Sequence, residues 1–167
     1  VAREVKGPLC RKIAFWTKNL AVEPAMTRQQ TTAALEVGIQ LAGELKQEGF
    51  SILATGEMGI GNTTTSSAVL AALLQIPARQ VTGRGAGLST QGLERKIQVI
   101  EQALALHRPD PGDPLDVLSQ VGGLDIAGMA GLFLGGGVYG IPVVIDGLIS
   151  GVAALIAQRL APGLEAY

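Results

Sequence analysis

A chain of 167 residues with 47% apolar content can bury a sizeable core, so we expect a single domain over residues 1–167. Thirteen basic and 14 acidic residues give a formal charge of −1, with no basic block and few aromatic residues, which disfavours nucleic acid as a partner and favours a small molecule. The single cysteine, Cys10, cannot form an internal disulfide, and no secretory leader pattern opens the chain, so we expect a cytoplasmic protein.

The first half of the chain predicts a helix, a strand, a glycine loop and a second helix. Thr27 is a suitable N-cap for a helix over 28–48, whose apolar residues recur at helical spacing. A mostly apolar strand candidate follows at 50–55, then the loop GEMGIG at 56–61, and then a helix over 64–74.

The middle of the chain repeats this alternation. Val81 and Thr82 form a second strand candidate before the glycine loop GRGAG at 83–87, and a helix is expected over 90–106, with His107 at its end. Further on, Asp113 can cap another helix whose first residue is a proline.

The charge-free stretch 126–145 has the length of a membrane span. Six of its residues are glycine and Pro142 divides it, so we expect a small-residue helix over 125–138, a buried strand over 142–146, and no membrane contact. A last helix is expected over 148–160. The alternation predicts a three-layer α/β fold, in which helices flank a Rossmann-like parallel sheet.

The segment GEMGIGNTT at 56–64 has the composition of a phosphate-binding loop. Glycines let a backbone approach a ligand closely, and Asn62, Thr63 and Thr64 lie at a helix N-terminus, which attracts anions. No lysine follows the glycines as in a P-loop, so hydrolysis of ATP or GTP is disfavoured. Glu57 would repel a phosphate and suits a sugar or a developing positive charge. A glycine-rich turn with a helix cap explains the composition equally well.

Four other side chains have both a functional and a structural interpretation. Arg84 lies within a glycine loop, where it can meet an anion, whereas Lys96 could reach a phosphate but is more simply explained as a solvated helix lysine. Asp146 at a strand end is either an active-site carboxylate or a helix cap. His107 is explained by the helix dipole. One histidine and one cysteine make no metal-ligand cluster, so we expect no metal.

Several segments resemble the nicotinate-nucleotide:dimethylbenzimidazole phosphoribosyltransferase family, which makes the lower-ligand nucleotide of cobalamin. They stand in the family's order and cover almost the whole chain: PAMT at 24–27, GEMGIGNTT at 56–64, GRGAGL at 83–88, RKIQVIEQALALH at 95–107, DPLDVLSQVGGLDIAGMAGLFLG at 113–135 and IPVVIDGLIS at 141–150.

The resemblance implies transfer of the phosphoribosyl group of nicotinate mononucleotide to a benzimidazole-type base, dimethylbenzimidazole, giving alpha-ribazole phosphate and nicotinate without a cofactor. It implies a catalytic role for the carboxylates of Glu57 and Asp146. It also implies that the phosphate and ribose are bound by Gly59, Asn62, Thr63, Thr64, Gly83, Arg84, Gly85 and Lys96.

The chain also departs from the family. Trp16 stands where the family pattern has a glycine, and the family's chain is about twice as long, with the proposed catalytic base beyond the equivalent of Tyr167. We therefore interpret the chain as the central part of such an enzyme, whose exposed sheet predicts a homo-oligomer such as a dimer. Two alternatives are a non-catalytic nucleotide-binding or assembly module and a different sugar-phosphate enzyme with Glu57 and Asp146 as a carboxylate pair.

Overall fold

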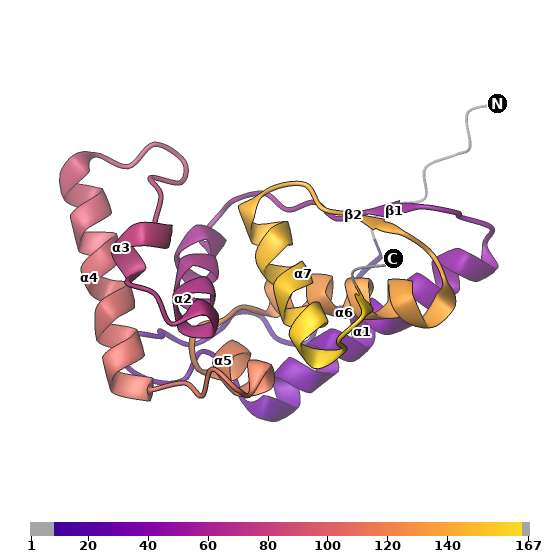
Figure 1. The fold of residues 1–167 in the computed structure, drawn as a ribbon, viewed down its shortest axis with the longest axis horizontal. Coiled ribbons are helices and arrows are strands. Elements are labelled where there is room, and N and C mark those ends of the chain that lie inside the picture. Colours follow the sequence, from indigo (N-terminus) through magenta and orange to yellow (C-terminus); the bar gives the residue numbers. More distant parts are fainter. Residues whose placement is uncertain (1–8, 165–167) are drawn as a thin grey trace.

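The computed structural model describes residues 9–164, which form a helix-rich α/β fold with a small parallel sheet (Figure 1). In chain order the elements are α1 (Arg28–Gln47), β1 (Leu53–Ala54), α2 (Asn62–Leu74), α3 (Ala78–Val81), α4 (Thr90–His107), α5 (Pro114–Val121), α6 (Leu124–Tyr139), β2 (Val143–Val144) and α7 (Leu148–Leu160). The predicted α/β class is confirmed, and the predicted helices agree with the observed ones to within two residues at each end.

Helices α1 and α6 pack with their backbones in contact. A Cβ atom on Gly38 would lie 2.1 Å from the carbonyl oxygen of Gly128, and one on Gly131 would lie 2.0 Å from that of Leu35. The glycines of the charge-free stretch therefore allow a close helix crossing. Within residues 9–164, no helix combines the length and the apolarity that crossing a bilayer requires.

Strands β1 and β2 are parallel neighbours, with Leu53 opposite Val143 and Ala54 opposite Val144. The first pair is buried and the second is exposed, so helices cover one face of this sheet. Because parallel strands end at the same edge, the loops that follow Ala54 and Val144 start side by side. This edge leads into the glycine loop at residues 56–61.

The strand predicted at Val81 and Thr82 is wrong. Val81 is the last residue of the short helix α3, which follows the N-cap Pro77, and the Thr82 hydroxyl donates to the carbonyl oxygen of Ala78 at 2.7 Å. Thr82 has extended backbone angles, but no strand of the described residues pairs with it. The chain therefore enters the second glycine loop from a helix.

Candidate functional site

Both glycine loops meet at the N-terminus of α2. Between them lies a pocket of about 390 Å³, which we call the loop pocket. It is lined by Gly59, Gly61, Thr63, Thr64, Arg84, Ala86, Gly87, Leu88, Ser89 and Lys96. Residues from three separate segments thus line one pocket. Among them are Gly59, Thr63, Thr64, Arg84 and Lys96, whose role in binding phosphate and ribose stays a prediction from the resemblance.

The backbone around this pocket requires glycine. Gly61 is the N-cap of α2 and has a φ of +79°, a left-handed conformation that side chains disfavour. In the other loop, Gly85 has a φ of +57°, and a Cβ there would lie 3.0 Å from Thr63 Oγ1. Within the described part of the chain no side chain caps α2, so the N–H groups of its first turn are available to an anion.

Lys96 extends from α4 to a side chain in the first turn of α2 and is only 7% exposed. Its Nζ donates to Thr63 Oγ1 at 2.9 Å and to the carbonyl oxygen of Gly83 at 3.1 Å. Burial lowers the pKa of the ammonium group, and none of the ion pairs among residues 9–164 includes it. The expectation of a solvated lysine is therefore wrong, because α4 packs against α2 with this side chain between them.

Arg84 borders the same pocket and stiffens its own loop. Its guanidinium donates to the carbonyl oxygen of Leu88 at 2.8 Å and to Thr90 Oγ1 at 3.1 Å. Two of its donors are therefore engaged within the loop, so Arg84 adds positive charge at the exposed rim of the pocket.

The side chain of Asn62 joins two carboxylates. Its Nδ2 donates to Glu57 Oε2 at 2.9 Å and to Asp125 Oδ2 at 2.8 Å, and Glu57 Oε2 also accepts from the backbone N–H of Gly59. The candidate site thus has a cationic side at Lys96 and an anionic side at Glu57 and Asp125. Sequence reasoning missed Asp125, whose only signal is an acidic residue in the first helical turn after a glycine pair.

Asp146 follows β2, but no hydrogen bond or ion pair among residues 9–164 joins it to Glu57. Its backbone N–H donates to Ser150 Oγ at 3.1 Å, and Ser150 Oγ lies 2.5 Å from Thr55 Oγ1, which ties the two strand ends together. The interpretation of Asp146 as a helix cap is wrong, because Gly147 is the N-cap of α7.

His107 has a structural role, as expected. It is the last residue of α4, and its Nε2 lies 2.7 Å from the carbonyl oxygen of Leu20.

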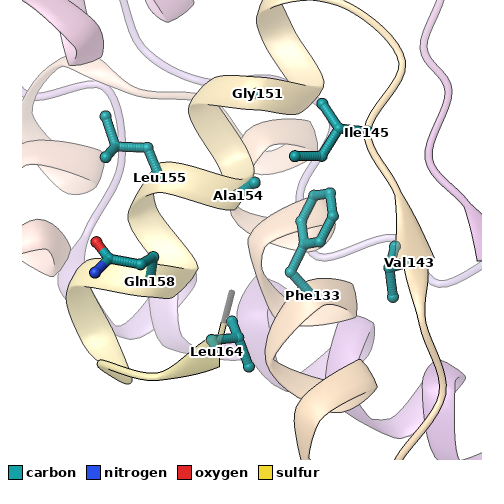
Figure 2. Close-up of a pocket in the computed structure, with 8 residues that line it drawn as sticks. All are labelled: Phe133, Val143, Ile145, Gly151, Ala154, Leu155, Gln158 and Leu164. Atoms are coloured by element: carbon teal, nitrogen blue, oxygen red, sulfur yellow. The ribbon is translucent and has the colours of Figure 1, made fainter. Parts of the chain in front are cut away.

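A second pocket of about 420 Å³ lies between α6, β2 and α7, as Figure 2 shows. Its walls include Phe133, Val143, Ile145, Leu155 and Leu164, and they carry no charged side chain. A phosphate would find no cation there, so this pocket suits an anion less well than the loop pocket does.

Comparison with known proteins decides the family. The model of a family described as "Phosphoribosyltransferase" matches residues 1–167. The chain belongs to this family. The loop pocket and the carboxylates at Asn62 are therefore features of a phosphoribosyltransferase chain.

Two relatives indicate how much of such a protein the chain represents. It is 59% identical to the nicotinate-nucleotide–dimethylbenzimidazole phosphoribosyltransferase of Roseiflexus sp. (strain RS-1), over 94% of this chain and 44% of that protein. It is 56% identical to the enzyme of the same name from Citrifermentans bemidjiense, over 97% of this chain and 46% of that protein. The chain spans about half the length of the curated relatives it matches.

Solved structures give the same result. The chain is similar to the crystal structure of CobT from Thermus thermophilus, with a TM-score of 0.88 and 43% identity over 98% of this chain and 50% of that one. The α/β arrangement is thus that of a phosphoribosyltransferase, over about half of its length.

Proposed function

We propose that this chain supplies the nucleotide-phosphate half of an active site that transfers the phosphoribosyl group of nicotinate mononucleotide to dimethylbenzimidazole. The products would be alpha-ribazole phosphate and nicotinate. The observation that carries the proposal is Lys96, a buried ammonium without a carboxylate partner among residues 9–164, beside an uncapped helix N-terminus. The names of the relatives support the choice of substrates.

In this proposal the phosphate is held by Gly59, Thr63, Thr64 and Lys96, with Arg84 at the rim. Gly83 contributes the carbonyl group that orients Lys96, and Gly85 allows its loop to approach Thr63. Asn62 contributes its backbone N–H at the start of α2, since its side chain is engaged by carboxylates. Phosphate anchored in this way would fix the ribose relative to Glu57.

The reaction breaks the bond between C1′ of the ribose and the pyridinium nitrogen, and the bonding electrons return to the ring, which leaves as nicotinate. The unprotonated nitrogen of the benzimidazole forms the new bond to C1′ with its lone pair, and the N–H proton on the other ring nitrogen passes to a base. We propose that Glu57 stabilises the positive charge at C1′ in the transition state. Asp146, at the same edge of the sheet, is a second candidate for this role.

A turnover assay tests this function. The purified chain is incubated with nicotinate mononucleotide and dimethylbenzimidazole, and mass spectrometry follows alpha-ribazole phosphate and nicotinate. Product that forms with the wild-type chain and is lost with Lys96→Ala supports catalysis by the chain itself. Product formed equally by both chains would contradict the proposed phosphate site.

A second candidate is a non-catalytic nucleotide-binding or assembly module. The observation that favours it is that no hydrogen bond or ion pair among residues 9–164 joins the two candidate catalytic carboxylates, Glu57 and Asp146. This candidate predicts that nicotinate mononucleotide binds saturably and in a Lys96-dependent way, and that no alpha-ribazole phosphate forms.

We further propose that the chain forms one α/β domain and acts in the cytoplasm as a homo-oligomer such as a dimer. Support for self-association comes from apolar side chains exposed on and around the sheet, such as Ile52 at 58% and Val144 at 46% exposure.

A further inference from the structure

Asn62 is fixed by two carboxylates that come from distant parts of the chain. Its side chain is buried, and its Nδ2 donates to Glu57 on the loop after β1 and to Asp125 on α6. The opposite amide orientation would place Oδ1 against both carboxylates, so these contacts determine which way the amide points. Its Oδ1 is buried and has no hydrogen-bond partner among the described residues.

Asp125 is the member of this group that lies on a helix. It lies in the first turn of α6, where the helix dipole favours a negative charge. A Cβ on the N-cap residue Gly123 would lie 2.6 Å from Asp125 Oδ1, so the carboxylate lies against the backbone of the helix N-terminus. Both carboxylates are exposed, but Glu57 lies on a glycine loop whereas Asp125 lies on a helix.

Glu57 and Asp125 line one hollow of about 290 Å³ together with apolar side chains, among them Leu41, Met129 and Leu132. We call it the carboxylate hollow. None of the ion pairs among residues 9–164 includes either carboxylate. Apolar walls and unpaired negative charge suit a flat aromatic ring with a positive charge.

We propose that Asp125 is a positioning residue that acts through Asn62 to hold Glu57 at the carboxylate hollow, and that the hollow selects mononucleotides with a positively charged ring. The inference rests on the proposed function, since it assumes that a phosphate occupies the pocket on the Lys96 side. Asp125 would then bias binding toward pyridinium nucleotides and against neutral ones of the same size.

Calorimetric titration of the 167-residue chain with a matched pair of nucleotides tests this inference. Nicotinamide mononucleotide carries a positive ring and uridine 5′-monophosphate a neutral one, on the same ribose phosphate. Asp125→Asn removes the charge that fixes the Asn62 amide, because the new side-chain amide can turn its own NH2 group toward Asn62 Nδ2. We expect it to weaken binding of the pyridinium nucleotide about tenfold, the effect of losing one charge-assisted hydrogen bond that holds Glu57, and to leave binding of the uridine nucleotide unchanged.

Two further variants make the result specific. Glu57 lies on an exposed loop, so Glu57→Gln should fold normally even if Asp125→Asn does not. It should lower the preference for the pyridinium nucleotide in the same way. Asp116→Asn changes an aspartate in the first turn of α5, outside the site, and should leave the preference intact.

The outcomes separate the inference from the proposed function. Suppose that Lys96→Ala weakens binding of both nucleotides, while Asp125→Asn and Glu57→Gln leave the ratio of the two dissociation constants unchanged. The role of Asp125 is then overturned and the phosphate site stands. If neither nucleotide binds, or binding is independent of Lys96, both are overturned.

Discussion

Lys96 makes folding stability depend on pH. Burial lowers the pKa of its ammonium group from the ordinary 10.5, so the folded chain holds this proton less tightly than the unfolded chain does. The resulting destabilisation is complete below the lowered pKa and disappears as the pH rises toward 10.5. We predict that the free energy of unfolding of the wild-type chain rises across this window relative to Lys96→Met.

Urea denaturation of the two chains at a series of pH values measures this difference. If the free energies of unfolding of the two chains vary with pH in parallel, Lys96 is solvated in the folded chain. A bound phosphate should reduce the difference, because an anion beside the ammonium group restores its pKa.

Part of the site could be predicted at the scale of single residues. The glycines at 59, 61, 85 and 87 have positive φ angles, and composition alone indicated unusual backbone in those loops. The burial of Lys96 could not be predicted, because it depends on which helix faces α4. Asp125 could not be predicted either, since its contact with Asn62 joins residues 63 positions apart.

At the scale of elements, the crossing of α1 and α6 depends on glycine. Gly131→Ala would place a methyl group against the backbone of Leu35, and overpacking of this kind costs about 1–3 kcal/mol. We predict that it lowers the free energy of unfolding by about that amount, measured by urea denaturation.

Gly128→Ala is the matched control on the same helix. A Cβ there would have its nearest neighbour at 3.9 Å, in ordinary contact with the carbonyl oxygen of Ala34. Alanine is the better helix former by roughly 0.5–1 kcal/mol, so this variant should be neutral or stabilised. Equal destabilisation by the two substitutions would mean that the crossing is not the cause.

The elements differ in how well the sequence predicts them. Helix α1 starts at the predicted residue, because Thr27 and Gln30 form a capping box within one turn. The strands are shorter than the apolar runs at 50–55 and 142–146, since a strand extends only as far as its neighbour pairs with it. Val81 was mistaken for a strand residue for the same reason, because a β-branched residue needs a partner strand.

At the scale of the whole molecule, the outer face of the sheet predicts self-association. Ile52 and Val144 are exposed apolar residues at the sheet, and such surfaces favour protein contacts. We predict that Ile52→Lys and Val144→Lys shift the chain toward monomer in sedimentation-velocity experiments. Val138→Lys, at the end of α6 and 68% exposed, is the control, and an equal shift with it would point to nonspecific association.

The family could be predicted from sequence because its signature segments are local runs of residues, among them 56–64 and 141–150. The match of 94% of this chain to 44% of a relative agrees with the expectation of a partial chain. The small sheet was not predicted, because the number of paired strands depends on the whole assembly of elements.

The central claim is that a nucleotide phosphate binds between the two glycine loops. Titration of the isotopically labelled chain with nicotinate mononucleotide, followed by amide NMR, tests it most directly. We predict saturable shifts confined mainly to the amides of residues 59–64 and 83–88 and abolished by Lys96→Ala. Saturable shifts centred elsewhere, or none at all in the folded chain, would contradict the claim.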